Sequence, residues 1–83
     1  MSAPIVIYSR RDCHLCDEAK AAVAPLARSR GLEVETVDVD GDPSLVERYG
    51  LEVPVVFVYG RKAFKYRVDT AKLASLLDRP EAS

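Results

Sequence analysis

The two cysteines of this chain, Cys13 and Cys16, lie between an apolar run at residues 5–8 and an alanine-rich stretch at residues 17–29. The apolar run is rich in β-branched residues and predicts a buried strand, whereas the alanine-rich stretch predicts a helix. The first thiol then stands where a helix begins, and the unpaired N–H groups and the helix dipole favour a negative charge there. A thiolate is a nucleophile, and a second thiol one turn along can attack any mixed disulfide that the first one forms. This arrangement predicts thiol redox chemistry.

The composition is that of a soluble globular protein with one domain, which we place at residues 1–83. Of its 83 residues, 48% are hydrophobic and 30% are charged, and the formal net charge is −1. This balance gives no reason to expect nucleic-acid binding, and no apolar run approaches the roughly 20 residues that a membrane-spanning helix needs. The first four residues lack the charged and apolar regions of a secretion signal, so we expect a cytoplasmic protein. Two cysteines in that compartment favour a catalytic or metal-binding role over a structural disulfide.

The first half of the chain predicts a strand, a long helix and a second strand. The strand covers residues 4–9, and Asp12 is the expected N-cap of a helix over residues 13–30 that ends at Gly31. Pro25 lies inside this helix and should kink or divide it, because proline removes one backbone donor. Residues 33–38 alternate as a second strand, with Val34, Thr36 or Val37, and Val39 as the expected apolar contacts.

The second half predicts a short helix, a hairpin and a last helix. In order, these are a helix over residues 43–49 capped by Asp42, a strand over 55–59, a turn at Gly60-Arg61, a strand over 63–67 and a helix capped by Asp69. In the last strand we expect Phe64 and Tyr66 on one face. The order β-α-β-α-β-β-α predicts an α/β fold, with a four-stranded mixed sheet and helices on both faces. Residues 79–83 should be frayed.

Three stretches of the sequence resemble the glutaredoxins, a family of the thioredoxin superfamily. Residues 8–16 are similar to the strand and active-site loop of that family, although Arg10 stands where the family usually has a lysine. Residues 52–58 are similar to its Thr-Val-Pro segment, in which the proline is cis and faces the cysteines. Gly60 falls at the family's hairpin turn. The Cys-x-Leu-Cys form is most similar to a branch of short bacterial glutaredoxin-like proteins, and the resemblance implies a thioredoxin fold.

The chain departs from the glutaredoxins in two segments that matter for function. His14 and Leu15 stand between the cysteines, where the family usually has Pro-Tyr or Gly-Phe. Residues 64–69 contain no glycine, whereas the family has a Gly-Gly pair there whose backbone binds glutathione. Bulky side chains at these positions obstruct a close approach to the backbone, so glutathione specificity does not carry over with the fold.

Seven residues are candidates for the site. Cys13 is the candidate nucleophile and Cys16 the candidate resolving thiol. The candidates for binding the substrate disulfide or thiol are Arg10, Arg11, His14, Val53 and Pro54.

Each binding candidate has a plainer interpretation. Arg10 and Arg11, together with Lys62, are suited to the carboxylates of glutathione or of an acidic partner, but solvated surface charge is the alternative. His14 is either a cation that stabilises the Cys13 thiolate or an exposed residue with little effect. A cis Val53–Pro54 bond turns the Val53 backbone towards the sulfurs, whereas a trans proline only opens the strand.

The leading hypothesis is a thiol–disulfide oxidoreductase with a Cys13/Cys16 dithiol–disulfide couple. One alternative is glutathione-dependent deglutathionylation by Cys13 alone. Another is a metal-binding or partner-binding module without redox turnover, although Cys13, Cys16 and His14 offer at most three ligands to a metal. We therefore expect no metal and no cofactor, with glutathione only as a co-substrate. The expected partner is a disulfide-containing protein or a small thiol, with no nucleic acid and no membrane, and the protein should be a monomer.

Overall fold

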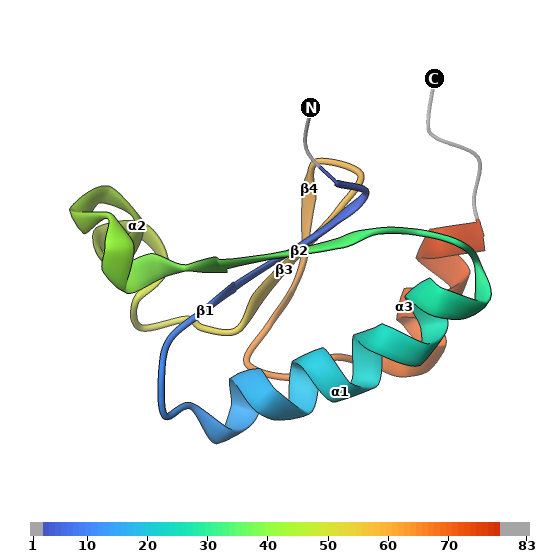
Figure 1. Ribbon diagram of the computed structural model, residues 1–83, viewed down its shortest axis with the longest axis horizontal. Coiled ribbons are helices and arrows are strands. Elements are labelled where there is room, and N and C mark those ends of the chain that lie inside the picture. The colour runs from blue at the N-terminus through green and yellow to red at the C-terminus, as the bar shows by residue number, and fades with distance from the viewer. Residues whose placement is uncertain (1–2, 79–83) are drawn as a thin grey trace.

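The structure is a computed structural model that describes residues 3–78 (Figure 1). Its elements are β1 (Ile5–Ser9), α1 (His14–Ser29), β2 (Val34–Asp38), the 3₁₀ helix η1 (Val39–Gly41), α2 (Pro43–Tyr49), β3 (Val55–Val58), β4 (Arg61–Lys65) and α3 (Thr70–Asp78). The predicted order of strands and helices is confirmed. The added element is η1, which lies between β2 and α2. The frayed segment predicted at 79–83 lies outside the described residues.

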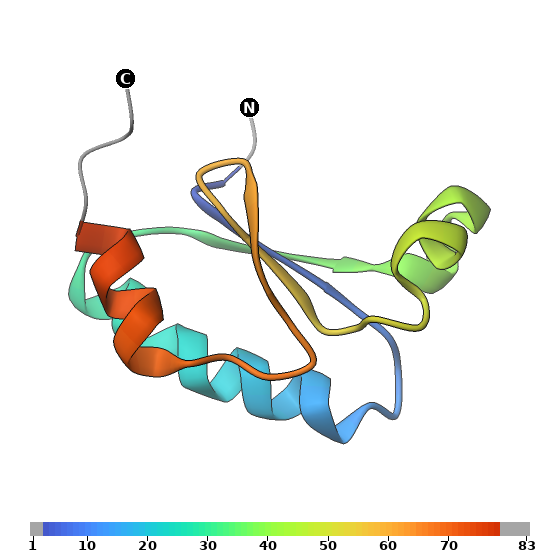
Figure 2. The same ribbon diagram turned by 180° about the vertical axis from the view of Figure 1, so that it is seen from behind.

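The four strands form one mixed sheet in the order β2-β1-β3-β4. Strand β1 is parallel to β2 and antiparallel to β3, and β3 is antiparallel to β4. Helices α1 and α3 lie side by side on one face of the sheet, as both ribbon views show (Figures 1 and 2). Helix α2 lies at the end of the sheet where the chain leaves β1, so α2 and the loop that leads to Cys13 are neighbours.

The main core lies between the sheet and the pair α1 and α3. Alternate residues of β1 are buried, which is the pattern of a strand that is covered on one face more than on the other. The buried cluster consists of Ile5, Ile7, Val23, Ala27, Val56, Val58, Phe64, Leu73 and Leu77. This core fixes the position of α1, and therefore of the two cysteines at its first turn.

The opposite face of the sheet carries a smaller aromatic cluster. Tyr8 of β1 packs against Tyr49 of α2, with 4.7 Å between ring centroids, and against Phe57 of β3, with 5.5 Å. Because Tyr49 belongs to α2, this packing places α2 against the opposite face of the sheet, and the prediction of helices on both faces is confirmed.

Asp42 caps α2 as predicted, because its side chain accepts a hydrogen bond of 2.8 Å from the backbone N–H of Ser44.

Pro25 neither ends nor divides α1, so the predicted division of that helix is wrong. The helix runs without interruption from His14 to Ser29 (Figure 1). Proline removes the bond that residue 25 would donate to the carbonyl of Ala21. Both Ala21 and Pro25 are exposed, so water can satisfy that carbonyl.

The hairpin between β3 and β4 turns one residue earlier than predicted. Its two turn residues are Tyr59 and Gly60, with φ of 50° and 81°, and Arg61 already belongs to β4. Two consecutive left-handed residues are typical of a tight type I′ hairpin.

The apolar contacts predicted for β2 are also only partly right. Val39 is buried and Val37 is half-buried, but Val34 and Thr36 are exposed, because β2 is an edge strand.

None of the helices within residues 3–78 combines the length and the apolar character that crossing a membrane requires.

Candidate functional site

Cys13 is itself the N-cap of α1, and the prediction of Asp12 in that role is wrong. The backbone of Cys13 is extended, and its Sγ accepts a hydrogen bond of 3.1 Å from the backbone N–H of Cys16. Asp12 instead adopts a left-handed conformation with φ of 54°, and its side chain is exposed. The sulfur thus takes the place of the usual side-chain oxygen of an N-cap, and it accepts a hydrogen bond from one of the N–H groups that the helix leaves unpaired.

Cys16 has a very different environment, although it lies only one helical turn away. Both thiols are reduced, but Cys13 is half-buried whereas Cys16 is fully buried. Burial raises the pKa of the Cys16 thiol to about 11, and the hydrogen bond with Cys13 adds to this increase. A backbone hydrogen bond from Arg10 lowers the pKa of Cys16, but this effect is smaller. Cys16 is therefore a neutral, shielded thiol near pH 7.

This difference predicts that alkylation will distinguish the two thiols. In a Cys13→Ser variant, iodoacetamide should label Cys16 slowly at pH 8, because burial shields this thiol and raises its pKa even without the Cys13 sulfur. The labelling rate should then rise with pH above pH 8, provided that the protein stays folded. In the matched Cys16→Ser variant, the half-exposed Cys13 should be labelled much faster at pH 8. Mass spectrometry over time measures both rates, and equal rates at pH 8 would contradict the assigned burial.

Arg10 connects the loop before Cys13 to α2 and to η1. Its guanidinium donates to both carboxylate oxygens of Asp40, at 2.8 and 3.3 Å, and to the backbone carbonyl of Gly50 at 3.3 Å. The Arg10–Asp40 ion pair raises the pKa of the guanidinium. Arg10 therefore holds three segments together, and its charge is already paired. Arg11 differs, because its side chain is 89% exposed and lies 4.0 Å from Asp38.

The other charged candidates lie on the surface. His14 is the first residue of α1 and is exposed. Lys62 forms an ion pair of 2.6 Å with Glu52, and this pair lowers the pKa of the Glu52 carboxyl. Lys65 lies 3.9 Å from the same carboxylate. Two of the three side chains proposed for carboxylate binding, Arg10 and Lys62, are thus engaged within the protein.

The Val53–Pro54 peptide bond is cis, as predicted. Val53 is half-buried and Pro54 is buried. Tyr8 of β1 pairs with Val55 of β3, so Pro54 lies at the sheet end from which the loop to Cys13 leaves. The structure therefore brings the cis proline and the cysteine pair to the same end of the molecule.

Tyr66 does not continue the face of β4 that carries Phe64, so the prediction that these two side chains share one face is wrong. Strand β4 ends at Lys65, and Tyr66 adopts a left-handed conformation with φ of 67°. Phe64 is buried, whereas Tyr66 is 45% exposed. The backbone N–H of Tyr66 donates a hydrogen bond of 2.9 Å to the carbonyl of Pro54, which joins the loop after β4 to the cis-proline segment.

Sequence reasoning missed three contributors to the site: Asp40, Gly50 and Tyr66. Asp40 and Gly50 lie 30 and 40 residues from Arg10, and no local pattern marks such a pair. Among residues 3–78, no group of three or more His, Cys, Asp or Glu side chains is placed to hold a metal ion. Within the described part of the chain, the site thus consists of two thiols, a cis proline and the loops that hold them.

Comparisons with known proteins agree with this geometry. An uncharacterized protein of Mycobacterium tuberculosis is 32% identical over 95% of this chain and 88% of its own length. The X-ray structure of a structural-genomics target protein from X. campestris is 37% identical, covers 89% of this chain and 95% of that one, and has a TM-score of 0.73. A thioredoxin mutant from Halobacterium salinarum, at 25% identity, gives a TM-score of 0.62 over 89% of this chain and 70% of its own. These similarities establish an α/β thioredoxin fold.

The family assignment rests on a match along most of the chain. The family model described as a glutaredoxin-like domain (DUF836) matches residues 4–78. This range contains every described strand and helix and both cysteines. The chain therefore belongs to the glutaredoxin-like domain family of the thioredoxin superfamily.

Proposed function

We propose that this protein is a thiol–disulfide oxidoreductase that works through a Cys13/Cys16 dithiol–disulfide couple. One observation carries the proposal: the 3.1 Å hydrogen bond from the Cys16 backbone N–H to the Cys13 sulfur at the start of α1. It supports a nucleophilic role for the half-buried thiol at the start of the helix, with a buried thiol one turn behind it. The family and the fold support a thiol redox role of this kind.

In the first step, the Cys13 thiolate attacks one sulfur of the substrate disulfide. A bond forms between the Cys13 sulfur and that sulfur, the substrate S–S bond breaks, and the other half of the substrate leaves as a thiolate that takes a proton from water. Cys13 suits this step because it is the less buried of the two thiols.

In the second step, Cys16 attacks the Cys13 sulfur and releases the second half of the substrate as a thiol. Cys16 must lose its proton for this attack. In the reduced protein, the hydrogen bond and the charge of Cys13 both raise the pKa of Cys16. Once Cys13 is in a mixed disulfide, these two contributions disappear, whereas the backbone hydrogen bond from Arg10 remains. Cys16 therefore becomes easier to ionise at the step where it is needed.

The cycle closes when an external thiol reductant gives two electrons to the Cys13–Cys16 disulfide and restores both thiols. The net reaction is the reduction of one substrate disulfide to two thiols. We further propose that the protein acts as a cytoplasmic monomer on the disulfide of a protein or of a small thiol. Val53, next to the cis proline, is the backbone segment that we assign to contact with the substrate.

A mixed disulfide trapped in a Cys16→Ser variant tests this mechanism. When that variant reacts with a disulfide-bonded peptide in which each half has a distinct mass, it should accumulate one covalent adduct on Cys13. The wild-type protein should instead release the peptide and form its internal disulfide. Mass spectrometry without reducing agent distinguishes the two products. Full turnover by Cys16→Ser with glutathione as the reductant would instead support the monothiol mechanism, and no adduct on Cys13 would contradict both.

A further inference from the structure

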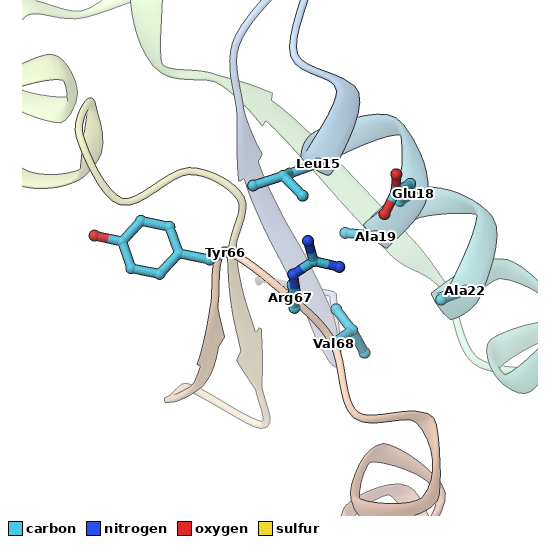
Figure 3. Close-up of a pocket in the computed structure, with 7 residues that line it drawn as sticks. All are labelled: Leu15, Glu18, Ala19, Ala22, Tyr66, Arg67 and Val68. Atoms are coloured by element: carbon cyan, nitrogen blue, oxygen red, sulfur yellow. The ribbon is translucent and has the colours of Figure 1, made fainter.

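A pocket lies between α1 and the loop that follows β4 (Figure 3). Its volume is about 190 Å³. The helix wall consists of Leu15, Glu18, Ala19 and Ala22, and the loop wall of Tyr66, Arg67 and Val68. Spacings of three and four residues place the helix residues on one face of α1. The pocket is thus built from side chains of one helix face and one loop.

The pocket begins next to the proposed nucleophile. Leu15 lies between the two cysteines in the sequence, so the pocket starts within the first turn of α1. On the other wall, the backbone N–H of Tyr66 donates a hydrogen bond to the carbonyl of Pro54, the cis proline. A substrate attached to Cys13 therefore has both walls of this pocket within reach.

The chemistry of the walls is mixed in a way that suits a peptide. Leu15, Ala19, Ala22 and Val68 provide an apolar interior, and the two alanines leave the space that larger side chains would fill. The guanidinium of Arg67 points from the loop towards α1, and Glu18 lies on the opposite wall (Figure 3). Within residues 3–78, neither charged group forms an ion pair. Arg67 can thus donate hydrogen bonds to main-chain carbonyls, and Glu18 can accept them from main-chain N–H groups.

We propose that this pocket binds an apolar side chain adjacent to the reacting cysteine of a polypeptide substrate. The inference rests on the proposed oxidoreductase function and names its substrate class. The volume is suited to one aliphatic side chain, and the charged groups of Arg67 and Glu18 at the walls are suited to the flanking peptide groups. A hydrophobic pocket of this kind discriminates by about tenfold or more for each methylene group that it accepts or excludes.

Two peptides and a matched pair of variants test the proposal. Each peptide carries one cysteine joined to thionitrobenzoate, whose coloured release reports attack by Cys13. One peptide has leucine on both sides of the cysteine and the other has serine. The wild-type protein should react about tenfold faster with the leucine peptide. Ala22→Leu fills the pocket and should remove this preference, whereas Ala21→Leu, at an exposed position of the same helix, should retain it.

A small symmetrical disulfide, hydroxyethyl disulfide, separates this inference from the proposed function. The wild-type protein and Ala21→Leu should both reduce it, because this reaction needs the two thiols and no side chain bound in the pocket. If Ala22→Leu does not fold, Ala22→Met introduces an unbranched side chain and serves the same purpose. Equal wild-type rates with the two peptides, or a preference retained by the folded pocket-filled variant, would overturn the inference alone. If the wild-type protein does not reduce hydroxyethyl disulfide, the proposed function is overturned.

Discussion

Replacement of Cys13 by serine should lower the rate of disulfide reduction by at least about a thousandfold, to the level of the uncatalysed reaction. A serine hydroxyl is not ionised near neutral pH and cannot form the mixed disulfide. Serine is, however, a favoured N-cap, so its oxygen can accept the N–H of Cys16 that the sulfur now accepts. The variant therefore removes the chemistry and keeps the local structure. The rate should be measured with a peptide disulfide and a thiol reductant.

The matched control is Ala21→Ser, which introduces the same side chain at an exposed position of α1 and leaves both thiols in place. Its activity should remain within a few-fold of wild type. Circular dichroism and the thermal midpoint should show that Cys13→Ser is folded. Activity of Cys13→Ser near the wild-type level would exclude Cys13 as the nucleophile.

The local features of the site could be predicted from the sequence because each depends on residues that are close together in the chain. The strand before Cys13 and the helix after it follow from periodicity and composition alone. The cis bond before Pro54 came from the resemblance to glutaredoxins, and the structure confirms it. Gly31 ends α1 as expected, since it adopts φ of 65° just beyond the helix.

The features that the sequence did not reveal depend on contacts between distant segments. In the sequence, Arg10 looks like a cation that is free to bind a substrate. In the structure its guanidinium forms an ion pair with Asp40, and this contact becomes visible only when η1 is placed beside the loop that leads to Cys13. Tyr66 continues an alternating pattern in the sequence, but β4 ends before it. The chain turns at Tyr66, whose backbone N–H donates a hydrogen bond to the carbonyl of Pro54. In both cases a tertiary contact outweighs a local pattern.

The position of the N-cap shows how chemistry can change a local rule. Statistics favour Asp12 as the cap, because aspartate is a common N-cap and cysteine is not. The structure gives that role to Cys13, whose sulfur accepts the N–H of Cys16. A capping aspartate would place a carboxylate, rather than the thiol, at the helix N-terminus. The observed arrangement reserves this position for the group that must carry a negative charge in the proposed mechanism.

A large loss of stability should come from Leu73→Ala in α3. Leu73 is fully buried in the cluster that also contains Val23 and Ala27 of α1. Loss of a buried leucine side chain removes apolar contacts and leaves a cavity, so the free energy of unfolding should fall by about 2–5 kcal/mol. Urea unfolding of the reduced protein, followed by circular dichroism, measures this change.

Leu51→Ala is the same substitution at a position that is 89% exposed, and its free energy of unfolding should stay within about 0.5 kcal/mol of wild type. Equal effects of the two substitutions would contradict the assignment of α3 to the core.

The comparison also bears on the site, because the loop with Arg67 and Val68 lies directly before α3. If α3 holds that loop against α1, Leu73→Ala should weaken the preference for the leucine peptide while Leu51→Ala preserves it. A folded Leu73→Ala protein that keeps the full preference would mean that the loop is held by its bond to Pro54 instead.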